Sequence, residues 1–270
     1  MSSISVGGVP FHIRIDGREG VPWVVMAHGL ATNLSMWDDL VDVLKHDYRC
    51  LRYDARGHGE TPASAGDYSF DLLVRDAAAI MDELRIARAH FIGLSMGGMV
   101  AMGLALDQPG RFASISVCDA RAEADAEYIE GWHHRIKVVR EGGMEALVER
   151  TLTRWFTPAF LAKSSPALDK MRLMMARTSR DGYCGCAAAL KALDYGRRIG
   201  QIRVPTLLLV GAQDLGAPPE IVRAMHRTMP SSRYVEIPEA GHISNVEQPG
   251  LFAEAVRGFL ETIDTSRART

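Results

Sequence analysis

The chain has 270 residues, of which 47% are hydrophobic and 24% are charged, and its formal net charge at pH 7 is -2. This length supports a sizeable buried core, and the charge balance gives neither a basic stripe for nucleic acid nor an acidic tail. The first residues lack the basic start and long apolar core of a signal peptide, and no apolar run reaches the length of a membrane span. The sequence therefore predicts a cytoplasmic protein with no membrane or nucleic-acid partner, and it predicts no particular oligomeric state.

Strand and helix patterns alternate over the first 120 residues. Residues 3–7 and 10–15 alternate as two strands joined by a glycine turn. Later apolar runs are continuous, which is typical of strands buried on both faces of a parallel sheet. Apolar residues at helical spacing separate these runs. The predicted buried strands are 23–27, 48–53, 90–94 and 112–118, and the predicted helices are 69–84 and 97–106.

The alternation stops at Arg121 and resumes near residue 200. Between these points the sequence predicts no convincing buried strand and mainly helical pieces, among them 129–141, 144–153 and 168–178. Afterwards it predicts strands at 205–211 and 233–237 and helices at 219–229 and 249–263. The predicted fold class is therefore α/β: one sheet domain of mostly parallel strands with flanking helices, interrupted by a helical insertion. We expect a core at 1–120 and 200–264, a cap at 121–199, and a disordered tail at 265–270.

A nucleophile motif follows the predicted strand 90–94. Gly93-Leu94-Ser95-Met96-Gly97 matches G-x-S-x-G, between a strand and a helix as that motif requires. The tight turn holds the serine in a strained conformation, and larger side chains at the two glycines would collide with neighbours. The sequence thus predicts Ser95 as a nucleophile exposed at the carboxyl edge of the sheet.

A serine hydroxyl needs a base, and the base needs an acid that fixes its tautomer. His242 follows the final predicted strand, so it lies on a loop at the same edge. Asp214 follows the strand 205–211 and gives the chain order Ser, Asp, His of α/β-hydrolases. Asp119 is an alternative acid, because it also ends a strand, although it could instead pair with Arg121.

An oxyanion needs fixed N–H donors. We predict the backbone N–H of Met96, directly after the nucleophile, and that of Leu30, in the loop after the first parallel strand. His28 and His58 stand in glycine-rich loops at the same edge and are predicted to line the pocket.

Several segments together resemble the α/β-hydrolase superfamily. They are His28-Gly29, residues 54–59 (DARGHG), residues 93–98 (GLSMGG) and Gly241-His242. Within it, residues 154–158, 181–190 and 241–249 resemble 3-oxoadipate enol-lactonases. Two departures lie near the cap: Asp119-Ala120 replaces an expected Asn-Thr pair, and Lys191-Ala192-Leu193-Asp194 replaces Arg-Asp-Met-Asp.

The resemblance implies an α/β-hydrolase fold, with a mostly parallel eight-stranded sheet, flanking helices and a helical cap insertion. It also implies a serine hydrolase that opens an ester or lactone through an acyl-enzyme and requires no metal or cofactor. The expected substrate is 3-oxoadipate enol-lactone or a related small acidic lactone. Its free carboxylate calls for an arginine, for which the candidates are Arg56, Arg121, Arg135 and Arg154. Among cap residues, Trp132, Arg135 and Trp155 are the predicted substrate contacts.

Other activities fit the same motifs. One alternative is a C–C bond hydrolase of aromatic degradation, and another is a general carboxylesterase or perhydrolase. A non-catalytic ligand receptor is a third, because some proteins of this fold keep the three side chains without turnover. Turnover of p-nitrophenyl acetate that disappears with Ser95→Ala separates an enzyme from a receptor.

Overall fold

Eight strands form one sheet in the computed structural model, which describes residues 2–267. The order across the sheet is β1-β2-β4-β3-β5-β6-β7-β8. Strands β3 to β8 run parallel, whereas β1 pairs antiparallel with β2 and β2 pairs antiparallel with β4. The strands are β1 (Ser2–Val6), β2 (Val9–Asp16), β3 (Trp23–Ala27), β4 (Arg49–Tyr53), β5 (Ala89–Leu94), β6 (Phe112–Cys118), β7 (Thr206–Gly211) and β8 (Ser232–Ile237). The predicted fold class is confirmed.

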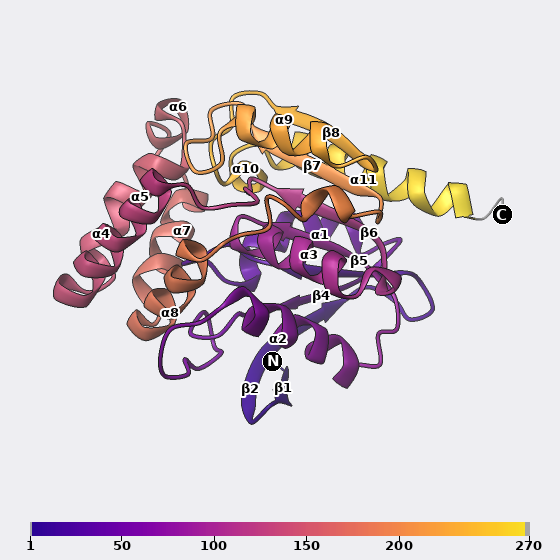
Figure 1. Ribbon diagram of the computed structural model, residues 1–270, viewed down its shortest axis with the longest axis horizontal. Helices are drawn as coiled ribbons and strands as arrows, with labels where there is room; N and C mark the ends of the chain where they lie inside the picture. The colour runs from indigo at the N-terminus through magenta and orange to yellow at the C-terminus, as the bar shows by residue number, and fades with distance from the viewer. Residues whose placement is uncertain (1, 268–270) are drawn as a thin grey trace.

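Helices cover both faces of the sheet. In Figure 1, α2, α3 and α9 lie on the near face, and α1 and α11 pack together on the far face. The helices of the sheet domain are α1 (Asp38–Leu44), α2 (Phe70–Glu83), α3 (Met96–Asp107), α9 (Pro219–Thr228), α10 (Ser244–Glu247) and α11 (Pro249–Arg267). Strands β5, β6 and β7 are buried along their whole length, as expected for continuous apolar runs between two helical layers.

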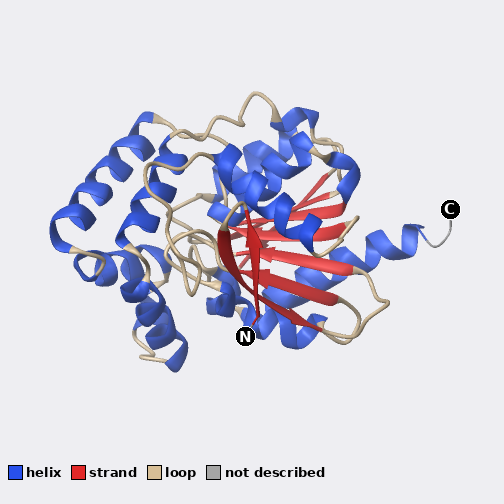
Figure 2. Ribbon diagram, turned by 90° about the horizontal axis from the view of Figure 1, so that it is seen from below, coloured by secondary structure: helices blue, strands red, loops and turns tan. Residues whose placement is uncertain are grey.

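Five further helices come between β6 and β7. They are α4 (Ala126–Gly142), α5 (Val148–Trp155), α6 (Pro158–Leu161), α7 (Pro166–Arg177) and α8 (Arg180–Lys191), and we call them the cap. All five fall inside the segment 121–199 that the sequence predicts as an insertion. Figures 1 and 2 show them grouped together at one end of the sheet.

The closing helix is longer than predicted. Its predicted end was Ile263, but α11 continues to Arg267 and occupies the first part of the predicted tail. Asp264 explains the extension, because its carboxylate accepts a hydrogen bond from Tyr48 Oη at 2.9 Å and lies 3.2 Å from His90 Nε2. The rest of the predicted tail, residues 268–270, lies outside the described residues.

The strand order creates a crevice at one edge of the sheet. The chain passes from β3 to β4 on one side and later returns to β5 on the other side of β3. Loops that leave β3 and β5 at their carboxyl ends therefore diverge, and such a switch point is where open α/β sheets bind ligands. The loop beginning at His28 follows β3, and Ser95 follows β5.

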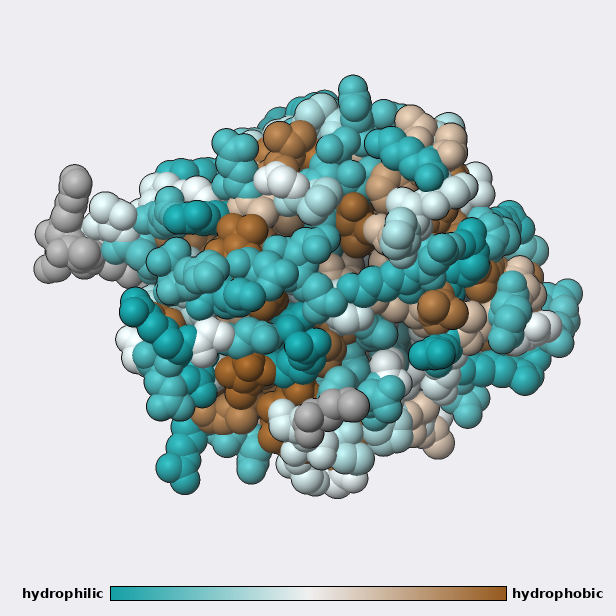
Figure 3. Space-filling view, turned by 180° about the vertical axis from the view of Figure 1, so that it is seen from behind, coloured by the Kyte–Doolittle hydropathy of each residue, from teal (hydrophilic) through white to brown (hydrophobic). Residues whose placement is uncertain are grey.

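The surface in Figure 3 is covered mostly by hydrophilic residues, with hydrophobic residues in small separate groups. Over residues 2–267, no helix combines the length and the apolar character needed to cross a bilayer.

Candidate active site

The turn at Ser95 depends on two close backbone approaches. Ser95 has a φ of 53° and a ψ of -114°, a conformation rare for a residue with a side chain. A Cβ at Gly93 would stand 2.0 Å from the carbonyl oxygen of Gly97, and one at Gly97 would stand 2.0 Å from that of Ala27. Only glycine fits at both positions, so the motif is required by the crossing of β5, α3 and β3.

Three side chains predicted from distant segments meet at this turn. His242 Nε2 lies 2.9 Å from Ser95 Oγ, and His242 Nδ1 lies 2.8 and 2.9 Å from the two carboxylate oxygens of Asp214. Asp214 is 2% exposed and His242 is 8% exposed. The Oδ1 atom of Asp214 also accepts the backbone N–H groups of Gly216 and Ala217, at 2.6 and 3.0 Å. The carboxylate is thus held in place, and the hydroxyl, imidazole and carboxylate form one series.

Asp119, the alternative acid, has other partners. Its Oδ1 accepts the backbone N–H of Gly211 at 2.8 Å, and its Oδ2 accepts the hydroxyl of Ser244 at 2.5 Å. Burial and, after it, the nearby charge of Asp214 raise the pKa of Asp119 well above its usual value. No hydrogen bond joins Asp119 to His242 in the described part of the chain, so this geometry favours Asp214 as the partner of the imidazole.

The loop after β3 lies against the serine. A Cβ at Gly29 would be 3.5 Å from the Cβ of Ser95. The N–H groups of Leu30 and Met96, both predicted as oxyanion donors, have no protein acceptor within residues 2–267. Met96 is the first residue of α3, where an N–H has no partner inside the helix. Both N–H groups are therefore free to donate to an acceptor from outside the described chain.

His58 holds this loop from beneath, which sequence reasoning missed. Its Nε2 accepts the backbone N–H of Ala31 at 3.0 Å, and its Nδ1 lies 2.9 Å from the carbonyl oxygen of Arg56. Ala31 has a φ of 61°, so the loop is strained at that residue. His28 and His58 were predicted to line the pocket, and this is wrong: both are buried under the loop because their ring nitrogens bond backbone groups.

The pH dependence of stability tests the state of His58. Burial, and then the neighbouring His28, lower the pKa of His58 to about 3. Below pH 6.5 the unfolded chain binds a proton at this position that the folded protein does not bind, so the free energy of unfolding falls as the pH falls toward 3. In His58→Gln this slope should be shallower by up to ~1.4 kcal/mol per pH unit.

Urea unfolding at pH 7, 6, 5 and 4 measures the slope for each protein. His46→Gln, at an exposed position, is the control and should keep the wild-type slope. An equal slope in His58→Gln and the wild type would show that His58 does not remain neutral in the folded protein.

A cavity of about 1130 Å³ opens above the serine, between the sheet edge and the cap. Ser95 and His242 lie on its floor side, and the predicted contacts Trp132, Arg135 and Trp155 all line its cap side. Tyr183 lines it as well, and so does Tyr128, which the prediction left out of the site. Tyr128 and Trp132 lie one helical turn apart on α4 with their rings edge to face, and this spacing was the available signal.

The four candidate arginines differ in their partners. Arg56 lies outside the cavity and forms a two-point ion pair with Asp76, which removes it as a candidate. Arg121 is paired with Asp125, and Arg154 donates to the carbonyl oxygen of Leu215 at 2.9 Å.

Arg135 stands apart from the other three. Its guanidinium lies 4.3 Å from the ring centre of Trp132, and within residues 2–267 neither a carboxylate nor a carbonyl oxygen accepts a hydrogen bond from it. Desolvation and, to a smaller extent, the positive charge of Arg154 lower the pKa of Arg135. An anion bound in the cavity would stabilise the charged guanidinium and so offset both effects.

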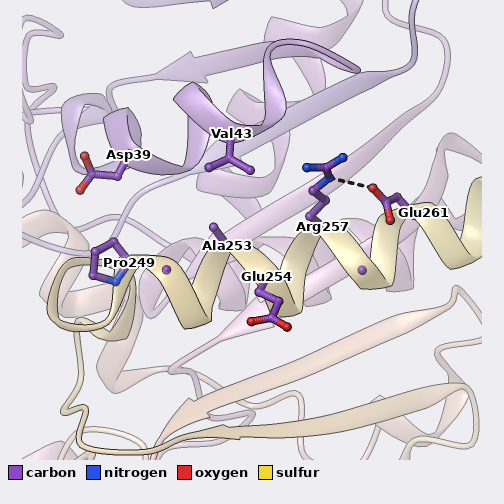
Figure 4. A pocket seen from close by; sticks show the side chains of 9 residues that line it. Asp39, Val43, Pro249, Ala253, Glu254, Arg257 and Glu261 are labelled. Carbon is purple, nitrogen blue, oxygen red and sulfur yellow. Dashed lines mark hydrogen bonds and ion pairs between the residues drawn. The ribbon is translucent and has the colours of Figure 1, made fainter.

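A second hollow, of about 680 Å³, lies between α1 and α11 (Figure 4). Its Arg257 is already paired with Glu261 at 2.7 Å. Neither Ser95 nor His242 lines it, so the hydroxyl, imidazole and carboxylate series faces the cavity under the cap and not this one.

Comparisons with known proteins agree with the fold. The model of the family described as alpha/beta hydrolase fold matches residues 22–249. The chain is 34% identical over 267 residues to 3-oxoadipate enol-lactonase 2 of Acinetobacter baylyi, with 96% of each chain covered. The solved enol-lactonase of Burkholderia xenovorans superposes with a TM-score of 0.93 at 37% identity, covering 96% of this chain and 99% of that chain. A thermophilic esterase of Thermogutta terrifontis with bound malate gives a TM-score of 0.89 at 28% identity, with 97% of each chain covered. This chain therefore belongs to the α/β-hydrolase family and is a hydrolase of the carboxylic ester class.

Proposed function

We propose that this hydrolase opens a small lactone that carries a free carboxylate, of the kind represented by 3-oxoadipate enol-lactone. The observation that carries the proposal is the linked series Ser95, His242 and Asp214 below a cavity whose half-buried Arg135 has no anion partner. The similarity to enol-lactonases over nearly the whole chain supports the same substrate class.

In the proposed first step, Ser95 Oγ attacks the lactone carbonyl while His242 Nε2 takes its proton. Asp214 holds the opposite ring nitrogen of His242 in its protonated form and stabilises the imidazolium. The carbonyl oxygen becomes negative and is held by the N–H groups of Leu30 and Met96. A preorganised donor of this kind is typically worth ~3–4 kcal/mol in the transition state.

Collapse of the tetrahedral intermediate breaks the ring C–O bond, and His242 returns the proton to the leaving oxygen. When that oxygen is an enol, tautomerisation to the ketone follows, and this makes ring opening difficult to reverse. His242 then removes a proton from water, and the resulting hydroxide attacks the carbonyl carbon of the acyl-enzyme. The bond between that carbon and Ser95 Oγ breaks, His242 returns the proton to Ser95 Oγ, and the second carboxylate is released. Every proton passes through one imidazole, so none of these steps requires a metal ion.

Arg135 is the proposed partner of the substrate carboxylate. A charge-assisted hydrogen bond to a carboxylate contributes about 1.5–3 kcal/mol. Arg135→Gln should therefore lower kcat/KM for a carboxylate-bearing lactone by ~10- to 100-fold. The same change should alter kcat/KM for a neutral short ester by less than ~3-fold, because that ester has no charge for the guanidinium to bind.

Steady-state kinetics on the two substrates measure this difference. Lys137→Gln is a matched control, because it removes a positive charge from an exposed position of the same helix. Equal losses on the acidic lactone and the neutral ester would mean that Arg135 supports the cap and does not bind the carboxylate.

A panel assay with product analysis tests the function as a whole. The wild type and Ser95→Ala are compared on an enol-lactone, a neutral lactone, a p-nitrophenyl ester and a vinylogous diketone. The proposal expects the highest kcat/KM of the wild type on the acidic lactone, and a loss of about 10⁶-fold on every substrate with Ser95→Ala. Faster C–C cleavage of the diketone would instead identify a C–C bond hydrolase.

A further inference from the structure

A buried carboxylate joins the cap to the loop that carries His242. Glu247 is 7% exposed and ends the short helix α10. Its Oε1 accepts the backbone N–H of Thr157 at 3.1 Å and also the hydroxyl of Thr157, while its Oε2 accepts the backbone N–H of Gly241 at 2.8 Å. Thr157 lies in the turn between α5 and α6 of the cap, and Gly241 directly precedes His242.

A second connection runs beside the first. The carbonyl oxygen of Trp155, at the end of α5, accepts the backbone N–H of His242 at 2.7 Å. A Cβ at Gly241 would stand 2.4 Å from that same oxygen, so the two backbones approach closely only because residue 241 is glycine. The cap is thus joined to the His242 loop twice: directly, from Trp155 to His242, and through Glu247, from Thr157 to Gly241.

The chemistry of Glu247 is specific to a carboxylate. Every group bonded to it is a donor, and its two oxygens accept from two different segments. No Lys, Arg or His forms an ion pair with it in the described part of the chain, so its hydrogen bonds alone hold it in the interior. A buried carboxylate without a cation is costly unless its oxygens are satisfied in this way. An amide in the same place can accept on one side only and would turn N–H groups toward a donor on the other.

We propose that Glu247 is a positioning residue that couples the seating of the cap to the placement of the His242 imidazole. The inference rests on the proposed function, in which His242 is the base for Ser95. When residues 155–157 are docked, Glu247 and the Trp155 carbonyl fix the loop so that His242 Nε2 lies 2.9 Å from Ser95 Oγ. Docking of the cap therefore completes the wall of the substrate cavity and places the His242 imidazole at the same time.

The test compares Glu247→Gln with Glu254→Gln, a matched change at an exposed position of α11. The end point of fluorophosphonate labelling counts the competent sites, and kcat for a p-nitrophenyl ester is expressed per labelled site. A catalytic group misplaced by near 1 Å can lower the rate by about 100-fold. Glu247→Gln should therefore lower kcat per labelled site by ~10- to 100-fold across the pH plateau. Glu254→Gln should match the wild type.

A second pair of variants covers the case in which Glu247→Gln does not fold. Thr157→Val removes the hydroxyl donor, and Thr157→Ser keeps it. Thr157→Val should lower kcat per labelled site, whereas Thr157→Ser should keep it near the wild-type value. The double variant Glu247→Gln/Thr157→Val should have a kcat per labelled site no lower than that of Glu247→Gln alone. That non-additivity is the expected signature of one shared contact.

Two outcomes have different meanings. If Glu247→Gln or Thr157→Val lowers the melting temperature or the labelled fraction but leaves kcat per labelled site unchanged, the coupling is overturned and the contact is structural. If Ser95→Ala keeps its turnover in the same assay, the proposed function fails instead, whatever the Glu247 variants do.

Discussion

Ser95→Ala is expected to lower kcat on short esters and lactones by about 10⁶-fold, the scale of loss when a serine nucleophile is removed. The structure gives the reason, since the hydroxyl at 2.9 Å from His242 Nε2 is the group to be deprotonated at the floor of the cavity. The fold should not suffer, because alanine keeps the Cβ and the Ser95 N–H still bonds the carbonyl oxygen of Cys118 at 2.8 Å.

Continuous spectrophotometric assays at enzyme concentrations high enough to detect the residual rate measure this loss. Circular dichroism and the melting temperature serve as the control for folding. A Ser95→Ala protein within 100-fold of the wild type would require another nucleophile. A wild type without turnover on any ester or lactone of the panel would favour a receptor.

Asp214→Asn should lower kcat by about 10⁴-fold through the tautomer of His242. In the wild type, the N–H groups of Gly216 and Ala217 point at Oδ1 of Asp214. Those donors would keep the amide oxygen of an asparagine at the same place, which turns its NH₂ group toward His242 Nδ1. The imidazole would then carry its proton on Nε2 and could not accept one from Ser95.

Asp119→Asn is the matched comparison for this prediction. The amide oxygen in this variant can still accept the N–H of Gly211, and the Ser244 hydroxyl can rotate so that its oxygen accepts an N–H of the amide. The loss in kcat should therefore stay within about 10-fold. The reverse order, with a small loss at Asp214 and a large one at Asp119, would make Asp119 the acid.

The sheet was predictable from the sequence because its signals are local. The continuous apolar runs of β5, β6 and β7 have no polar face, and only a sheet covered on both sides buries such runs completely. The helix α8 was not predicted, because Gly182 and Gly185 disfavour a helix. In the fold both glycines are needed: a Cβ at Gly182 would stand 2.4 Å from the Cα of Gly57, and one at Gly185 would stand 2.8 Å from the ring of Tyr68.

The three linked side chains were also predictable, because each ends a strand and parallel strands bring their carboxyl ends to one edge. The choice between Asp214 and Asp119 needed coordinates, since both aspartates follow neighbouring strands and differ only in what their oxygens contact. The contacts of His58 with Ala31 and of Glu247 with Thr157 join segments far apart in the chain through backbone N–H groups. Backbone donors are present at every residue except proline, so the motifs that contain these two side chains do not show which backbone group each one bonds.

If Ser95 is the nucleophile, its Oγ is the atom that becomes covalently attached to the substrate. Intact-mass spectrometry and peptide mapping after treatment with a fluorophosphonate test it most directly. We expect one adduct per chain, on Ser95, formed rapidly in the wild type, much more slowly in His242→Ala and not at all in Ser95→Ala. An adduct on a different residue, or no adduct while the ester is still turned over, would show that Ser95 is not the nucleophile.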